Sequence, residues 1–135
     1  MTKPSVLFVC VKNGGKSQLA AALMRHRAGD AITVASAGTR PGSALNAEAV
    51  TSLDELGVST AGEQPKPVTE ELLDAADLVV VLGTEAQLDD PRGTPVEVWE
   101  TDEPSARGIT GMERMRLVRD DIAQRVDGLH RRLAP

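Results

Sequence analysis

Val6-Leu-Phe-Val-Cys-Val11, followed by Lys12-Asn-Gly-Gly-Lys-Ser17, is the stretch from which the fold of this chain can be inferred. The first six residues form a continuous apolar, β-branched run, typical of a strand buried on both faces of a parallel sheet. The residues from Ser17 to Arg27 are rich in helix formers, and Gly29 follows them. We therefore expect a strand, a tight glycine loop and a helix.

The rest of the chain continues this alternation. Further strands are predicted at 32–36, 78–82 and 96–99, and helices at 46–56, 69–76 and 112–133. Such an order predicts an α/β fold, with a parallel sheet flanked by helices on both faces and a ligand site at the carboxyl ends of the strands. The 135 residues contain no linker-like stretch, so we expect residues 1–135 to form a single domain.

The composition narrows the function. A formal net charge of −5 disfavours broad capture of nucleic acid or of an anionic membrane. No apolar run is long enough to span a bilayer, and the first residues do not resemble a signal peptide. A single cysteine and two histidines form no disulfide and no zinc pattern. We expect a cytoplasmic monomer that binds no metal, nucleic acid or membrane.

The loop after the first strand has the composition of an anion site. Adjacent glycines let successive backbone N–H groups point inward, Lys16 adds a cation, and a helix N-terminus contributes partial positive charge. The same surroundings favour the thiolate form of Cys10, which we predict to be a nucleophile. The oxyanion would be bound by the residues between them, namely Val11, Lys12, Asn13, Gly14, Gly15 and Lys16.

The residues of this loop allow two other interpretations. A lone cysteine at the end of a strand is often a small buried apolar residue, but the adjacent glycine loop argues for a reactive one. Gly15-Lys-Ser17 also ends the nucleotide-binding pattern G-x-x-x-x-G-K-[ST]. Position 10 is cysteine where that pattern needs glycine, and no predicted strand ends in an aspartate for magnesium. Both interpretations are disfavoured.

The chain resembles, over its whole length, the low-molecular-weight protein tyrosine phosphatases and the arsenate reductases that share their fold. The residues that carry the resemblance are Val6-Leu-Phe-Val-Cys10, Asn13, Lys16-Ser-Gln18, Ser36-Ala-Gly38, Trp99 and Glu103-Pro104. The resemblance implies a four-stranded parallel sheet and makes Cys10 the nucleophile. It also implies that Ser17 hydrogen-bonds the thiolate, that Asn13 steadies the loop, and that the acid before Pro104 protonates the leaving oxygen.

Two positions depart from the family pattern. The usual loop arginine is Lys16, which lacks the planar fork that grips two oxygens of a tetrahedral anion. The usual aspartate before proline is Glu103, with Asp102 beside it. Either carboxylate is a candidate general acid, and Glu103 is the first choice. Solvated loop acids without a catalytic role remain the alternative for both.

Small residues near the acid loop favour a bare oxyanion over phosphotyrosine. Ser105-Ala106 stand where phosphatases of the family usually carry tyrosines, so arsenate is the expected substrate and phosphate its analogue. The thioredoxin-coupled reductases carry two further cysteines near the end of the third strand, where this chain has Leu82-Gly-Thr84. An external thiol must therefore act. This is similar to the mycothiol-dependent, single-cysteine type of actinobacteria, with a mycoredoxin or glutaredoxin-like partner.

The residues leave two alternative functions open. A tyrosine phosphatase is the first alternative, and a non-catalytic oxyanion-binding module, suggested by Lys16, is the second. Trp99 is expected to anchor the core. His26 and His130 are assigned no role. The arginines beside or on the last helix could assist an anion, but solvated side chains are the preferred interpretation. These arginines are Arg107, Arg114 and Arg116.

Overall fold

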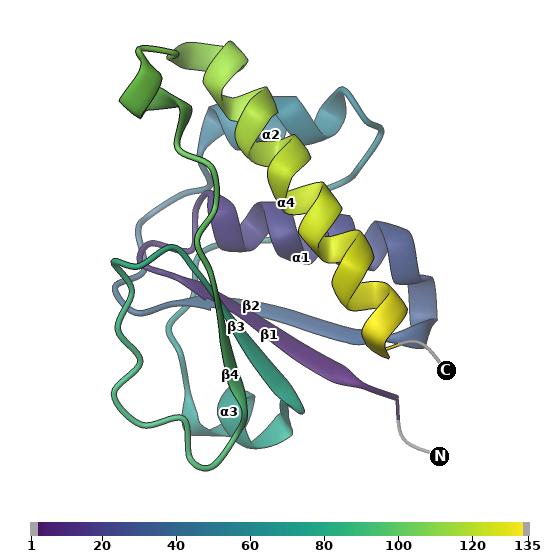
Figure 1. The fold of residues 1–135 in the computed structure, drawn as a ribbon. Helices are drawn as coiled ribbons and strands as arrows, with labels where there is room; N and C mark the ends of the chain where they lie inside the picture. The colour runs from purple at the N-terminus through teal and green to yellow at the C-terminus, as the bar shows by residue number, and fades with distance from the viewer. Residues whose placement is uncertain (1–2, 134–135) are drawn as a thin grey trace.

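A single parallel sheet organises the computed structural model, which describes residues 3–133 (Figure 1). Its strands are β1 (Ser5–Cys10), β2 (Thr33–Gly38), β3 (Leu78–Leu82) and β4 (Val96–Trp99), in the spatial order β2-β1-β3-β4. The predicted four-stranded parallel sheet is confirmed. Because β1 pairs with both β2 and β3, the loop that follows Cys10 lies in the middle of the carboxyl edge.

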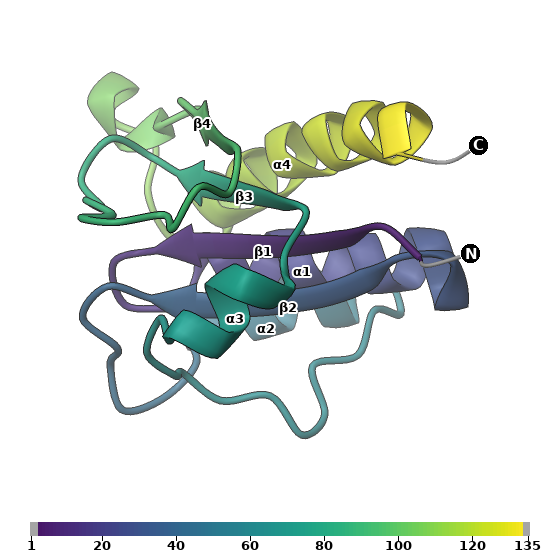
Figure 2. The same cartoon turned by 90° about the horizontal axis from the view of Figure 1, so that it is seen from below.

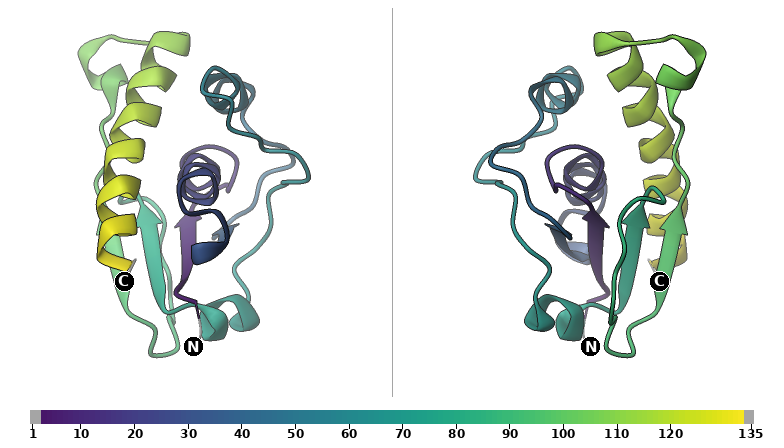
Figure 3. Two further views of the ribbon diagram at one scale, coloured as in Figure 1. Left: turned by 90° about the vertical axis from the view of Figure 1, so that its right-hand side faces the viewer. Right: turned by 90° about the vertical axis from the view of Figure 1, so that its left-hand side faces the viewer.

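Helices cover both faces of the sheet, as predicted. α1 (Lys16–Ala28), α2 (Ala47–Asp54) and α4 (Gly111–Leu133) lie on one side, and the short α3 (Glu70–Ala75) lies on the other (Figure 2). Figure 3 shows α1 and α2 end-on, with α2 farther from the sheet than α1. Two 3₁₀ turns, Gly29–Ala31 and Pro104–Arg107, were not predicted, and the second lies within a segment expected to be a plain loop.

Alternation along β1 divides the core. Val6, Phe8 and Cys10 face the α1 and α4 side, whereas Leu7 and Val9 face the α3 side. All five side chains are at most 8% exposed, which explains why the strand reads as an unbroken apolar run. Among residues 3–133, none of the helices has both the length and the apolar character that crossing a membrane requires.

Candidate active site

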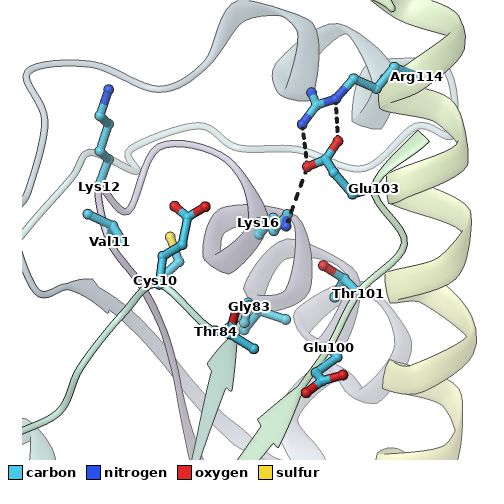
Figure 4. Close-up of a pocket in the computed structure, with 12 residues that line it drawn as sticks. Cys10, Val11, Lys12, Lys16, Gly83, Thr84, Glu100, Thr101, Glu103 and Arg114 are labelled. Carbon is cyan, nitrogen blue, oxygen red and sulfur yellow. Dashed lines mark hydrogen bonds and ion pairs between the residues drawn. The ribbon is translucent and has the colours of Figure 1, made fainter. Parts of the chain in front are cut away.

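A cavity of about 550 Å³ opens at the carboxyl edge of the sheet, above the end of β1 (Figure 4). Its walls come from the loop after β1, from the ends of β3 and β4, and from α4. The lining residues are Cys10, Val11, Lys12, Lys16, Leu82, Gly83, Thr84, Glu85, Glu100, Thr101, Glu103 and Arg114. The only cysteine of the chain therefore lies in the cavity between a glycine loop and a helix N-terminus.

The backbone of the loop is held with its amides turned inward. Its carbonyl oxygens accept hydrogen bonds from the neighbouring segment 39–46. The pairs are Thr39 to Cys10, Arg40 to Val11, Gly42 to Lys12 and Asn46 to Gly14, at 2.8–3.0 Å. Because each peptide unit is planar, a carbonyl that points outward turns the following N–H inward. The amides of residues 11, 12 and 15 have no acceptor among the described residues, so they are free to bind an anion.

Asn13 ties this loop to the rest of the fold. It is fully buried and adopts a left-handed backbone with φ of 55°, which asparagine tolerates better than most residues. Its amide side chain donates to Ser17 Oγ at 2.7 Å and accepts from the Lys66 N–H at 3.1 Å. Its carbonyl oxygen accepts from Gln18 Nε2 at 3.1 Å. The loop conformation is therefore fixed from three directions.

Two polar groups contact Cys10 Sγ. The Asn13 N–H lies 3.3 Å from the sulfur, and Ser17 Oγ lies 2.9 Å from it. Ser17 Oγ accepts a hydrogen bond from Asn13 Nδ2 and keeps a free lone pair and its own hydrogen, so either Ser17 or a Cys10 thiol can be the donor of the bond between them. When Cys10 is ionised, Ser17 is the donor. The sulfur therefore lies between the Asn13 N–H and the Ser17 hydroxyl, beside the N-terminus of α1.

Gly38, at the end of β2, allows the loop to pack closely. A Cβ atom at this position would lie 2.6 Å from the Val11 carbonyl oxygen and 3.0 Å from Asn13 Cβ. Both neighbours belong to the loop that surrounds the sulfur. Any side chain at position 38 would therefore displace the loop.

Three charged side chains from different elements meet at one side of the cavity. Arg114, on α4, donates two hydrogen bonds to the Glu103 carboxylate, at 2.8 and 3.0 Å. The Lys16 ammonium lies 3.9 Å from the same carboxylate (Figure 4). The lysine that replaces the expected loop arginine is thus partly neutralised by Glu103, which Arg114 holds in place.

The two candidate acids are both ionised in this arrangement. The Arg114 hydrogen bonds are the main cause of a Glu103 pKa lowered to about 2. Burial opposes them, and the Ser105 hydrogen bond and the charges of Arg114 and Lys16 lower the pKa further. Asp102 pairs with Arg107 at 2.8 Å, which lowers the pKa of Asp102 as well. Asp102 does not line the cavity. That either residue acts as the general acid stays a prediction, and Glu103 is the one that faces the site.

Comparison with known proteins places the chain in a family. Residues 5–135 match the family described as low molecular weight phosphotyrosine protein phosphatase. The chain belongs to this family. A putative arsenate reductase of Halobacterium salinarum is 32% identical over 124 residues, which are 88% of this chain and 85% of that protein. An arsenate reductase of Bacillus cereus strain Q1 is 30% identical over 128 residues, 92% of each chain.

Solved structures agree with this family membership. A thioredoxin-dependent arsenate reductase of Corynebacterium glutamicum superposes with a TM-score of 0.78 at 31% identity. The superposition covers 97% of this chain but only 62% of that longer protein. A structure described as an arsenate reductase in the phosphate binding state gives a TM-score of 0.84 at 25% identity, with 97% and 99% covered.

Most of the predicted site residues are brought together. Cys10, Val11, Lys12, Lys16 and Glu103 line the cavity. The loop also contains four predicted residues that do not line the cavity, namely Asn13, Gly14, Gly15 and Ser17. The contact of Ser17 with the sulfur is the one that the resemblance implied. Trp99 is buried in the core, 5.8 Å from Phe8 between ring centroids, as predicted. The catalytic and binding roles themselves stay predictions.

For Arg114, the preferred interpretation as a solvated arginine was wrong, and the alternative near the anion site agrees with its position. It lines the cavity and pairs with Glu103, whereas Arg107 and Arg116 form their ion pairs outside the cavity lining. Little in the sequence indicated that Arg114 would line the cavity, because arginine is common on helices rich in acidic residues. His26 and His130 do not line the cavity. In the part of the chain that the structure describes, no group of three or more His, Cys, Asp or Glu side chains is placed to hold a metal ion.

Proposed function

We propose that this chain reduces arsenate with one protein cysteine and an external low-molecular-weight thiol, for which mycothiol is the candidate. The observation that carries the proposal is Cys10, the single cysteine of 135 residues, lying in the cavity with the Asn13 N–H and the Ser17 hydroxyl in contact with its sulfur. The inward-pointing amides of the loop and Lys16 provide a binding site for a tetrahedral oxyanion. The relatives named arsenate reductases support the same activity.

In the first step the Cys10 thiolate attacks arsenic and water leaves. The monoanion H₂AsO₄⁻ itself carries both hydrogens of that water, so thiolate and arsenate give a Cys10–S–AsO₃²⁻ adduct and H₂O without a proton from the protein. A phosphate monoester instead needs a proton for its leaving alkoxide or phenoxide. Because Glu103 and Asp102 are both ionised here, the electrostatics of the site favour arsenate over an ester.

The second step needs a thiol from outside the chain. No cysteine stands at Leu82-Gly-Thr84, at the end of β3, or elsewhere in the sequence to take the arsenic from Cys10. The external thiol takes it instead, and arsenic keeps its oxidation state. A mycoredoxin or other glutaredoxin-like protein then attacks the thiol sulfur of this adduct, which transfers two electrons to arsenic, releases arsenite and leaves a mixed disulfide.

Two further functions are distinguished by experiment. The family description favours a tyrosine phosphatase, but no aromatic side chain is among the residues that line the cavity to stack on phosphotyrosine. The replacement of the loop arginine by Lys16 is the reason to consider an oxyanion-binding module without catalysis. That the protein acts as a cytoplasmic monomer stays a prediction.

The test is a coupled assay with pure protein, arsenate, mycothiol, a mycoredoxin and its NADPH-dependent reductase. We expect NADPH consumption that depends on arsenate and disappears in Cys10→Ser. No turnover above the Cys10→Ser control would refute the proposal. Hydrolysis of an aryl phosphate by the same sample would instead support the phosphatase. Phosphate binding without either reaction would support the binding module.

A further inference from the structure

The ammonium group of Lys16 is held by residues outside the loop. It lies 3.9 Å from the Glu103 carboxylate, and a Cβ atom at Gly83, which follows β3, would lie 3.8 Å from it. In Figure 4 the Lys16 nitrogen is on the side of the residue that faces Glu103. Part of the positive charge that the loop offers to an anion is therefore compensated by Glu103.

The formal charges that line the cavity cancel. The lining contains as many carboxylates as cations, the cations being Lys12, Lys16 and Arg114 and the carboxylates Glu85, Glu100 and Glu103. Lys16 and Arg114 share Glu103, whereas Lys12 forms no ion pair with any residue in 3–133. An anion is attracted over a distance by an excess of positive charge. A further cation beside the loop would therefore strengthen the attraction.

Arg40 is a cation in such a position. The segment after β2 runs alongside the loop, because the Arg40 N–H donates to the Val11 carbonyl at 2.8 Å and the Gly42 N–H donates to the Lys12 carbonyl at 2.9 Å. Arg40 also lines a second hollow, of about 490 Å³. This hollow shares Val11 and Glu85 with the first cavity. The two therefore adjoin, and Arg40 lies at the edge of the site although it is not part of the loop.

The Arg40 guanidinium is not committed to a carboxylate. Among the arginines in 3–133, only Arg40 and Arg131 form no ion pair. The carboxylates that line the second hollow are those of Glu85 and Asp89, and neither is paired with Arg40. The side chain of Arg40 is exposed, so its charge is available to an anion that approaches from solvent.

We propose that Arg40, together with Lys12, draws the tetrahedral oxyanion into the loop, and that these two cations supply the attraction that a loop arginine would otherwise provide. The inference rests on the proposed function and identifies residues that set its affinity for the anion. Arg40 is a positioning residue, which acts through its charge while the loop amides bind the anion. Lysine at position 40 should therefore serve, and neutral glutamine should not. Because Glu85 lines both hollows, removal of its charge should have the opposite effect.

The first experiment compares two reagents that differ in charge. Cys10 is alkylated with iodoacetate, an anion, or with neutral iodoacetamide, and both rates are followed by mass spectrometry. In a Lys12→Gln/Arg40→Gln double variant we expect the ratio of the iodoacetate rate to the iodoacetamide rate to fall about fivefold, from the loss of Coulomb attraction across a partly hydrated distance. Arg40→Lys should keep the wild-type ratio, and Glu85→Gln should raise it.

Arg131→Gln is the matched control. Arg131 is the other arginine without an ion pair, and it is exposed in the last turn of α4, at the opposite end of the sheet from the loop (Figure 1). Its removal should leave the ratio unchanged. The fall in the double variant should shrink in 1 M salt, because ions screen exposed charges. A ratio that is the same in the wild type and the double variant, or that falls equally in Arg131→Gln, would overturn the proposal.

The second experiment uses inorganic phosphate as the probe. The phosphate concentration that halves the rate of Cys10 alkylation by iodoacetamide should rise about threefold in Arg40→Gln and return to near the wild-type value in Arg40→Lys. A lysine that fails to restore protection would overturn the role of charge at position 40. Absence of protection in the wild type would also overturn the proposal, because there would be no bound anion to attract.

Arsenite formation separates this proposal from the reductase itself. In the coupled assay, Arg40→Gln should raise KM for arsenate about threefold with little change in kcat, because the bound anion keeps its contacts with the loop. Arsenite formation with an unchanged KM in Arg40→Gln would overturn the attraction and leave the reductase standing. Charge-dependent alkylation and phosphate protection without any arsenite from the wild type would leave the attraction standing and refute the reductase.

Discussion

The Arg114 guanidinium and the Glu103 carboxylate form a two-pronged ion pair, with N–O distances of 2.8 and 3.0 Å. This pair connects α4 to the turn at Pro104 and brings the carboxylate within 3.9 Å of the Lys16 ammonium. The acid loop is therefore linked to the oxyanion loop through charge.

Arg114→Gln should return the titration of Glu103 toward its ordinary range. The pKa of Glu103 is lowered from 4.5 to about 2, chiefly by Arg114. Because folding lowers the pKa of Glu103, its ionised carboxylate stabilises the folded protein at every pH above the pKa that the residue has in the unfolded chain. This stabilisation is lost as the pH falls through about 2. The difference in the free energy of unfolding between wild type and variant should thus reach its full size above about pH 5 and disappear at acidic pH. NMR titration of the Glu103 carboxyl carbon, with urea unfolding at each pH, measures both effects.

Arg116→Gln is the matched control for this prediction. Arg116 lies on the same helix and pairs with Glu55 instead, at 2.7 Å. Its removal should leave the Glu103 titration unchanged. A Glu103 that titrates near 4.5 already in the wild type would show that the pair does not persist in solution.

Ser17→Ala should slow every reaction that uses the Cys10 thiolate. A hydrogen bond to a charged group contributes roughly 1.5–3 kcal/mol, so we expect a loss of about tenfold or more at neutral pH. Iodoacetamide trapping of Cys10 across pH, with and without phosphate, measures it directly. Ser52→Ala removes a different buried hydroxyl, which donates to the Ala49 carbonyl on α2, and should not alter the trapping rate. Equal rates in Ser17→Ala and the wild type would contradict the geometry at the sulfur.

Lys16→Arg should not increase arsenate turnover. The longer arginine side chain would reach the Glu103 carboxylate, which lies 3.9 Å from the Lys16 ammonium. It would compete with Arg114 for this carboxylate instead of binding the oxyanion in the loop. Steady-state kcat/KM with arsenate tests this, with Lys3→Arg as a control on an exposed residue near the start of the chain. A large gain in turnover would identify the parent protein as a weakened enzyme that lacks its arginine.

Gly38→Ala and Gly128→Ala should change stability in opposite directions. The first inserts a methyl group 2.6 Å from the Val11 carbonyl oxygen, and overpacking of this kind costs about 1–3 kcal/mol. The second adds a methyl group to α4 where nothing lies within 4 Å, and replacing a helical glycine stabilises by about 1 kcal/mol. Urea unfolding gives both values. An unchanged free energy of unfolding in Gly38→Ala would mean that the loop can move to make room for the methyl group.

Local patterns in the sequence were sufficient for the fold and for the position of the nucleophile. The apolar run that ends at Cys10 predicted a strand buried on both faces of a parallel sheet, and the glycines after it predicted the loop at the carboxyl edge. Both features depend on neighbouring residues only. The same holds for Asn46 and Thr69, whose side chains accept hydrogen bonds at the starts of α2 and α3.

Contacts between distant segments could not be predicted in this way. Which of Asp102 and Glu103 faces the cavity depends on the 3₁₀ turn that begins at Pro104, and adjacent residues in a loop give no sign of it. The role of Arg114 depends on how α4 docks against the sheet edge. The bond from the Lys66 N–H to Asn13 Oδ1 joins residues 53 positions apart. Long-range geometry, not residue type, decides these cases.

The bonds that hold Asn13 imply that the oxyanion loop is ordered as soon as the protein folds. The polar atoms of Asn13 already form hydrogen bonds with Ser17, Gln18, Lys66 and the Cys10 sulfur. The loop is therefore preorganised, and little conformational entropy is lost when an anion binds. Affinity for the ion is thereby coupled to the integrity of a segment remote in sequence. Loosening the chain around Lys66 would weaken anion binding although no residue there touches the ligand.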